Sequence, residues 1–295
     1  MVWESGLIQQ IANLPFLVWG TDGSNPSATA FVKKKNNLIL IMEDKLDIFI
    51  LGYKAFEPKV SHPVYTIVDG GEEEFTTSLP KLNDSEGDSI SHLNGFYSEL
   101  TRIYWIWKNH PIKEYIGFCH YRRYFSFFDD IPNMDDIFKN HDIILPSPYG
   151  CSNVMRQYRN SHNLNDYKIA LAIIKKHFPD YYETALKFSI SSKEFYINNC
   201  FIMKREMFFK YCEFIFPILE SYLNYINAKK MEDVEKHVMD NKDDYLKKSY
   251  PNNQIWYQCR IGGFLAERLF SIWLLLNVPK ERIFYVPIKV TEKKY

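Results

Sequence analysis

Two short apolar runs near the start of the chain constrain its fold most strongly. Residues 47–54 are almost continuously apolar up to Gly52, and residues 64–68 are apolar up to Asp69-Gly70-Gly71. A strand that is covered on both faces of a parallel sheet has this pattern, because neither of its faces meets water. Helical patterns alternate with such runs along the rest of the chain, and this alternation is typical of an α/β fold.

Hydrophobic periodicity and turn residues predict the other elements. We expect strands at residues 47–52, 64–68, 115–124, 142–146, 194–203 and 283–287, and helices at residues 96–109, 167–188, 205–226 and 261–276. The first of these helices has Asn94 as its expected N-cap. Residues 72–88 are expected to form a loop and residues 229–248 a solvated segment. Residues 1–45 are predicted to be a hairpin-like extension of unknown role, and residues 46–295 the main domain.

The segment from Cys119 to Tyr124 carries the densest group of anion-binding side chains. It reads Cys-His-Tyr-Arg-Arg-Tyr and follows an apolar run. If it continues the strand, His120 and Arg122 share one face, and Tyr121 and Arg123 share the other. The planar fork of arginine suits phosphate, so the segment predicts a phosphorylated ligand. The alternative interpretation is that these arginines pair with surface acids.

Bulk composition excludes some classes of protein. The chain has 36 basic and 36 acidic residues and a formal net charge of zero, so no overall field favours nucleic acid as a partner. Its five cysteines are scattered, which argues against a disulfide framework and fits the cytoplasm. The amino terminus lacks the pattern of a secretory signal. The apolar residues 264–278 are too few for a bilayer span and predict a buried helix.

The ligand class is narrowed by the motifs that are missing. The sequence has neither a Walker phosphate loop nor a G-x-G-x-x-G motif, which disfavours nucleoside triphosphate hydrolysis and dinucleotide redox chemistry. An aromatic content of 17% suits flat pockets that bind sugars or bases. We therefore expect a nucleotide sugar, bound beyond the carboxyl ends of the strands.

Several residues at these strand and helix ends are candidate donor contacts. Gly52, Tyr53 and Lys54 could place a ring on the base, although Tyr53 could equally be core. Asp69 could hold the ribose or the base. Glu99 and Thr101, at the start of a helix, could contact the donor or cap the helix. Asn94 and the neighbouring His92 could contact the donor or serve as structural hydrogen-bond partners.

An ordered set of motifs resembles bacterial capsular and exopolysaccharide glycosyltransferases, whose domain older classifications describe as one of unknown function. The motifs are Ser91-His92-Leu93-Asn94, Tyr97 with Glu99-Leu100-Thr101, Tyr104-Trp105, His120-Tyr121-Arg122-Arg123-Tyr124 and residues 263–269. The resemblance covers residues 47–290. It implies a GT-A-like, Rossmann-like fold with a mixed central sheet flanked by helices. It also implies a UDP-sugar donor and a growing polysaccharide repeat unit as acceptor; some relatives transfer galactose or galactofuranose.

The resemblance leads to a hypothesis about metal use. Metal-dependent GT-A enzymes place an Asp-x-Asp motif where this chain has the His-Tyr-Arg-Arg segment. We expect His120 or Arg122 to neutralise the departing UDP in place of a metal, with Arg123 bracing a neighbouring acid. No cofactor is expected to be required, although manganese or magnesium stays open. Asp129-Asp130 and Asp135-Asp136 are fallback metal ligands.

The catalytic candidates are Asp88, Glu267 and His120. Transfer with inversion needs a carboxylate that deprotonates the acceptor hydroxyl, and burial in an apolar helix would raise the pKa of Glu267 towards that role. Glu267 could instead form a buried ion pair with Arg268 or with an arginine of the 119–124 segment. Asn198 and Asn199 are expected to bind sugar hydroxyls, or simply to satisfy a turn.

These observations predict a cytoplasmic hexosyltransferase that uses a UDP-sugar, with galactose in pyranose or furanose form as the expected sugar. The acceptor would be a lipid-linked oligosaccharide of capsular, exopolysaccharide or O-antigen synthesis, presented at the inner face of the membrane. Contact with the membrane would then be peripheral. A non-catalytic nucleotide-sugar-binding partner of an assembly complex and a sugar-phosphate transferase are the alternatives.

Overall fold

The structure is a computed structural model, and it describes residues 45–70 and 77–291. The predicted extension at residues 1–45 lies outside the described residues except for Lys45, as do Gly71 and the first part of the predicted 72–88 loop. The predicted division at residue 45 stays a prediction.

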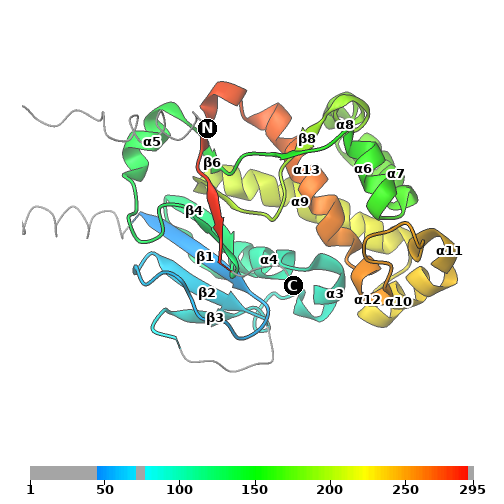
Figure 1. The fold of residues 1–295 in the computed structure, drawn as a ribbon, viewed down its shortest axis with the longest axis horizontal. Helices are drawn as coiled ribbons and strands as arrows, with labels where there is room; N and C mark the ends of the chain where they lie inside the picture. Colours follow the sequence, from blue (N-terminus) through cyan, green and yellow to red (C-terminus); the bar gives the residue numbers. More distant parts are fainter. Residues whose placement is uncertain (1–44, 71–76, 292–295) are drawn as a thin grey trace, which may run out of the picture. The chain divides into compact units, whose positions relative to one another are not determined.

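A mixed central sheet organises the described residues (Figure 1). Its strand order is β10-β6-β9-β4-β1-β2-β3, and β5 and β11 join it beside β4. β9 runs antiparallel to both of its neighbours, whereas the other pairs along this path are parallel. The strands are β1 Leu46–Gly52, β2 Tyr65–Asp69, β3 Lys81–Asn83, β4 Tyr115–His120, β5 Arg123–Phe125, β6 Ile143–Leu145, β9 Phe201–Lys204, β10 Ile283–Tyr285 and β11 Ile288–Val290. A separate ribbon pairs β7 Tyr149–Gly150 with β8 Glu194–Phe195.

Helices flank this sheet. They are α3 Asn94–Tyr97, α4 Leu100–Asn109, α5 Met134–Asn140, α6 Val154–Ser161, α7 Leu164–His177, α8 Pro179–Ser191, α9 Arg205–Tyr225, α10 Met231–Asp240, α11 Lys242–Tyr245, α12 Ile255–Gln258 and α13 Ile261–Asn277, with short 3-10 turns at Ser91–Leu93 and Lys280–Arg282. α13 packs against α8 and α9, and α4 packs against α9. No helix of the described segments has both the length and the apolar character that a membrane span needs.

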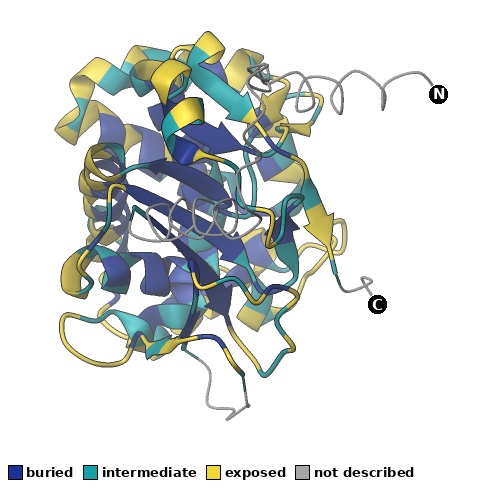
Figure 2. Ribbon diagram, turned by 90° about the vertical axis from the view of Figure 1, so that its left-hand side faces the viewer, coloured by how far each residue is buried: buried dark blue, intermediate teal, exposed yellow. Residues whose placement is uncertain are grey.

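β1 explains why the apolar pattern of residues 47–52 is continuous. Phe49 and Leu51 belong to the apolar cluster that α4, α9 and α13 complete, whereas Ile48 and Ile50 belong to a second cluster that includes Phe138 of α5. All seven residues of β1 are buried. Figure 2 shows this as a layer of buried strands inside a more exposed helical surface. The predicted α/β fold with a mixed central sheet flanked by helices is confirmed.

The predicted strand at residues 115–124 is wrong in one respect that matters for the site. The chain turns at Tyr121 and Arg122, so that β5 folds back antiparallel on β4 with His120 opposite Arg123. The expected alternation of side chains therefore fails, because it holds only along an uninterrupted strand. Consecutive residues of the turn can instead project in one direction.

Other predicted elements are interrupted in the structure. The 96–109 helix breaks at Ser98, whose φ of 55° no helix accommodates. The 194–203 strand breaks at Asn198 and Asn199, which both have positive φ, a conformation that asparagine tolerates better than most residues. The 167–188 helix divides at Pro179, the first residue of α8. Residues 72–88 contain β3, and residues 229–248 contain α10 and α11.

Candidate functional site

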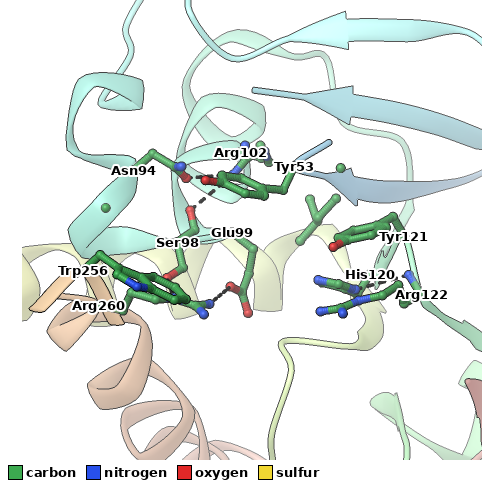
Figure 3. A pocket seen from close by; sticks show the side chains of 13 residues that line it. Tyr53, Asn94, Ser98, Glu99, Arg102, His120, Tyr121, Arg122, Trp256 and Arg260 are labelled. Atoms are coloured by element: carbon green, nitrogen blue, oxygen red, sulfur yellow. Dashed lines mark hydrogen bonds and ion pairs between the residues drawn. The ribbon is translucent and has the colours of Figure 1, made fainter. Parts of the chain in front are cut away.

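A pocket of about 250 Å³ lies at the carboxyl ends of β1 and β4 (Figure 3). Parallel strands of an α/β sheet commonly place ligands at this edge, because loops there leave the backbone open. Helical segments α3 and α12 and the start of α13 complete the walls. The described lining residues are Leu51, Gly52, Tyr53, Asn94, Gly95, Ser98, Glu99, Arg102, His120, Tyr121, Arg122, Trp256 and Arg260.

His120 ends β4 as a neutral hydrogen-bond donor. Its Nδ1 accepts a hydrogen bond from the backbone N–H of Arg122 at 3.2 Å, so the ring proton resides on Nε2. Burial lowers the pKa of His120 to about 3; the carboxylate of Glu99 opposes this shift, and three nearby arginines reinforce it. His120 is therefore uncharged at neutral pH. The expectation that His120 serves as a cation is therefore corrected. The neutral ring can act on a ligand as an N–H donor through Nε2.

Arg122 supplies a positive charge to the pocket. Its guanidinium carbon lies 5.0 Å from the centroid of the Tyr121 ring. Within residues 45–70 and 77–291, no carboxylate lies within ion-pair distance of Arg122, and its buried Nε has no hydrogen-bond partner. A buried donor without a partner is costly, so Arg122 is suited to an anionic ligand that would provide one.

Glu99 brings the one carboxylate found among the described lining residues. In Figure 3 it lies between Arg260 on one side and His120 on the other. Its Oε1 accepts from Asn199 Nδ2 at 3.1 Å, and its Oε2 is 3.9 Å from Arg260 Nη2. Burial acts to raise the pKa of Glu99, but the charge of Arg260 and hydrogen bonds from its own backbone and Asn199 outweigh burial, so the net pKa is lowered. Glu99 is therefore ionised at neutral pH.

A buried arginine holds the α3 side of the pocket in place. Arg102 is only 1% exposed, and its Nη1 donates to Asn94 Oδ1 at 3.0 Å and to the carbonyl oxygen of Ser98 at 3.3 Å. Asn94 is the first helical residue of α3 and accepts this bond, so the expected N-cap role is wrong. Arg102 and Asn94 together support the sharp turn at Ser98, from which Glu99 enters the pocket.

Two aromatic side chains lie at the rim. Tyr53 follows β1 and is 61% exposed, so the expectation of an accessible ring is favoured over that of a core residue. Trp256, on α12, is 64% exposed. Arg260 lies beside it and donates from Nε to Ser98 Oγ at 2.8 Å. The pocket thus combines two accessible rings with charged groups, an arrangement suited to a polar ligand with flat or apolar faces.

The structure brings together six of the candidate donor and catalytic residues, Gly52, Tyr53, Asn94, Glu99, His120 and Arg122, and Tyr121 of the same motif also lines the pocket. The other donor candidates do not belong to the lining. Lys54 is exposed, Asp69 is buried and pairs with Lys81 of β3 at 3.0 Å, and Thr101 donates to Asp84 Oδ2 at 2.7 Å. Arg123 is the first residue of β5 and directly follows the turn at Tyr121 and Arg122.

The remaining catalytic and acceptor candidates lie outside the lining as well. Asp88 is exposed and accepts a hydrogen bond from the Tyr104 hydroxyl at 2.9 Å. Glu267 pairs with Arg268 at 2.9 Å, as its alternative interpretation expected, and burial raises its pKa against the opposing charge of that arginine. The backbone N–H of Asn198 donates to Glu267, while Asn199 donates to Glu99. These asparagines therefore link Glu267 to the pocket carboxylate.

Three of the four fallback metal ligands, namely Asp129, Asp135 and Asp136, have structural partners for their side chains. Asp129 accepts hydrogen bonds from the backbone N–H groups of Ser61 and His62, and Asp135 pairs with Lys45 at 2.7 Å. Asp136 pairs with Lys139 at 2.7 Å. The described part of the chain contains no group of three or more histidine, cysteine or acidic side chains placed to hold a metal ion. The metal requirement stays a prediction.

Sequence reasoning missed four polar or aromatic lining residues: Ser98, Arg102, Trp256 and Arg260. One signal was available, because Arg102 lies one helical turn before Ile106 on the buried face of α4, and a charge at a core position indicates a specific role. The other three are brought together by tertiary packing. Arg260 and Ser98 are 162 positions apart, and no local pattern connects them.

The structure is an α/β fold with a central, mostly parallel sheet flanked by helices. This fold is similar to that of one solved glycosyltransferase. The chain matches the solved apo structure of the WbbM bifunctional glycosyltransferase with a TM-score of 0.61 and 22% identity over 84% of this chain. It covers 46% of that protein, less than half of its length. The mannosyltransferase Ktr4p from S. cerevisiae matches at a TM-score of 0.35 and 11% identity, over 98% of this chain and 86% of that one, a similarity too weak to support an argument.

The family model described as "Domain of unknown function (DUF4422)" matches residues 47–254, and the chain belongs to this family. No curated protein matches the chain.

Proposed function

We propose that this protein is a glycosyltransferase that transfers a hexose from a UDP-sugar. The observation that carries the proposal is the Arg122 guanidinium, which lines the pocket at the end of β4 without an ion-pair partner among the described residues. A diphosphate would supply the missing acceptors and offset the charge. The likeness of the fold to glycosyltransferases supports the same reading.

The donor would lie along the carboxyl ends of the strands. The exposed Tyr53 ring would stack on the uracil, since base–aromatic stacking tolerates a solvent-facing ring. Arg122 and the Nε2–H of neutral His120 would bind the pyrophosphate. As the bond between the sugar anomeric carbon and the phosphate oxygen breaks, its electron pair goes to UDP, and Arg122 would stabilise the resulting charge.

The proton of the acceptor hydroxyl needs a carboxylate. Glu99 is ionised and lines the pocket, whereas Asp88 and Glu267 lie outside the lining. We therefore place Glu99 as the base: its carboxylate takes the hydroxyl proton while the acceptor oxygen bonds to the anomeric carbon from the face opposite UDP. The configuration at that carbon would invert.

Galactose, in pyranose or furanose form, is the sugar that the motif resemblance favours, and a lipid-linked oligosaccharide of capsular, exopolysaccharide or O-antigen synthesis is the proposed acceptor. The proposed location is the cytoplasm, with peripheral contact at the inner face of the membrane. Donor recognition can be tested before either of these is known.

The test is a thermal-shift screen of UDP-, GDP- and dTDP-hexoses against the full chain, followed by mass analysis of the products. We expect a rise in melting temperature with uridine nucleotides alone, and slow release of UDP from one UDP-hexose. Arg159→Ala, which removes an exposed arginine of α6, is the matched control for Arg122→Ala. Binding of UDP without any turnover would favour a non-catalytic partner, and a product that gains phosphorus would indicate sugar-phosphate transfer. No shift with any uridine nucleotide would contradict the proposal.

A further inference from the structure

The pocket has a second half that the proposed donor contacts do not use. It is formed by Trp256 of α12 and Arg260 at the start of α13. Figure 3 shows both side chains on the opposite side of Glu99 from His120 and Arg122. The two halves therefore come from different parts of the fold: the donor half from the edge of the sheet, and the second half from the helical layer.

Trp256 offers a fixed, accessible aromatic surface. Its Nε1 donates to Oε1 of Gln254, the residue just before α12, at 2.6 Å, which satisfies the polar atom of the indole. Its ring stands edge-on to the Tyr257 ring, with centroids 5.8 Å apart and an interplanar angle of 86°. The surface that remains exposed is apolar, and the C–H face of a sugar ring is the complementary surface that stacks on such an indole.

Arg260 adds hydrogen-bond donors next to this ring. Its Nε is bound to Ser98 Oγ at 2.8 Å, so the guanidinium is held in one orientation. Nη2 lies 3.9 Å from Glu99 Oε2, and the side chain is 39% exposed. A guanidinium carries five N–H donors. The donors that Ser98 and Glu99 do not occupy can bind neighbouring hydroxyls of one sugar ring.

We infer that Trp256 and Arg260 form the subsite for the acceptor saccharide, an inference that rests on the proposed function. The sugar ring stacks on Trp256, its hydroxyls accept from Arg260, and the reacting hydroxyl points to Glu99. The donor pyrophosphate fits this half less well, because Arg260 is already paired with Glu99, whereas Arg122 has no carboxylate within ion-pair distance among the described residues. The position of Glu99 between the two halves matches the path of the proton from acceptor to base.

The test compares the full-length wild type with Trp256→Ala and Trp256→Phe, using two separate titrations. One measures UDP binding by calorimetry. The other measures binding of methyl galactopyranoside, methyl glucopyranoside and methyl mannopyranoside by saturation-transfer NMR with UDP present. Tyr225→Ala serves as the matched control, because Tyr225 is 65% exposed at the end of α9 and does not line the pocket.

We expect Trp256→Ala to weaken the best methyl hexoside by about tenfold, and Trp256→Phe, which keeps a ring, by about threefold. The affinity for UDP should stay within about twofold in every variant. An equal loss of UDP affinity in Trp256→Ala would overturn the inference by placing the nucleotide on this ring. Unchanged hexoside affinity in that variant, or no hexoside binding by the wild type, would also overturn it. In these last cases retained UDP binding leaves the donor proposal standing, whereas a wild type that fails to bind UDP contradicts the donor proposal itself.

Discussion

Glu99 is ionised and His120 is neutral, although both line the same pocket. The difference has a local cause: Glu99 has Arg260 and the Asn199 amide as partners, while His120 is buried among arginines and uses Nδ1 to accept from the backbone. A carboxylate acceptor next to an N–H donor can take a proton from one substrate and hydrogen-bond to the leaving group of another. Because Glu99 can accept the proton and neutral His120 can donate a hydrogen bond, Glu99 is the proposed base.

Glu99→Gln should keep the hydrogen bond from Asn199 but remove the base. We expect the transfer rate to fall by about 10²- to 10⁴-fold, with UDP affinity changed by about twofold or less. Because the pKa of Glu99 is lowered and that of His120 is about 3, wild-type activity should not decline as the pH is reduced from 7 to about 5.

Initial rates across this pH range measure both effects, with Glu183→Gln, an exposed residue of α8, as the control. A wild-type activity that drops through a pKa near 6, or full activity in Glu99→Gln, would exclude Glu99 as the base. Loss of activity in Glu267→Gln instead would move that role to Glu267.

A buried carboxyl joins three of the helices that flank the sheet. Asp166 Oδ1 accepts from the hydroxyls of Tyr222 on α9 at 2.8 Å and Tyr245 on α11 at 2.6 Å. Burial raises the pKa of Asp166 to about 7, against the opposing effect of these two hydrogen bonds. Asp166 therefore takes up a proton in the folded state at a pH where the unfolded chain remains ionised.

This shift has a defined sign in stability. Between pH ~4 and pH ~7 the folded state binds the extra proton, so the contribution of Asp166 is complete below its unfolded pKa and is lost as the pH rises through about 7. Asp166→Asn keeps the accepting Oδ1 and does not titrate. We expect its free energy of unfolding relative to wild type to rise between these pH values by on the order of 1–4 kcal/mol.

Urea unfolding at several pH values measures this difference, and Asp243→Asn, an exposed change on α11, is the control. Taking the difference from wild type removes the contributions of His120 and His162, whose lowered pKa values give the opposite slope. A difference that does not vary with pH would contradict the raised pKa.

Elements with continuous or amphipathic apolar patterns could be predicted from the sequence, and those shaped by backbone reversals could not. β1, α9 and α13 agree with their predicted ranges, because burial determines their patterns. The turn at Tyr121 and Arg122 has no Gly, Pro, Asn or Asp, so its residues gave no turn signal. The lining residues that follow the ends of β1 and β4 were largely among the predicted candidates, whereas Trp256 and Arg260 reach the pocket through helix packing and were not.

The whole molecule has a formal net charge of zero, so recognition of an anion must come from local arrangement. Arg102, Arg122 and Arg260 line the pocket, against the single carboxylate of Glu99 among the described lining residues. Arg102 is buried near Asp84, so Arg122 and Arg260 are the accessible cations among the described lining residues of the pocket. The central claim is that Arg122 binds the pyrophosphate of the donor without a metal ion.

Calorimetric titration of the full chain with UDP and with uridine, both in EDTA, tests this claim most directly. UDP is expected to bind at least about tenfold more tightly than uridine in the wild type, and Arg122→Ala should remove most of that difference while Arg159→Ala keeps it. Equal affinity for UDP and uridine, or UDP binding that appears only when manganese is added, would contradict the account.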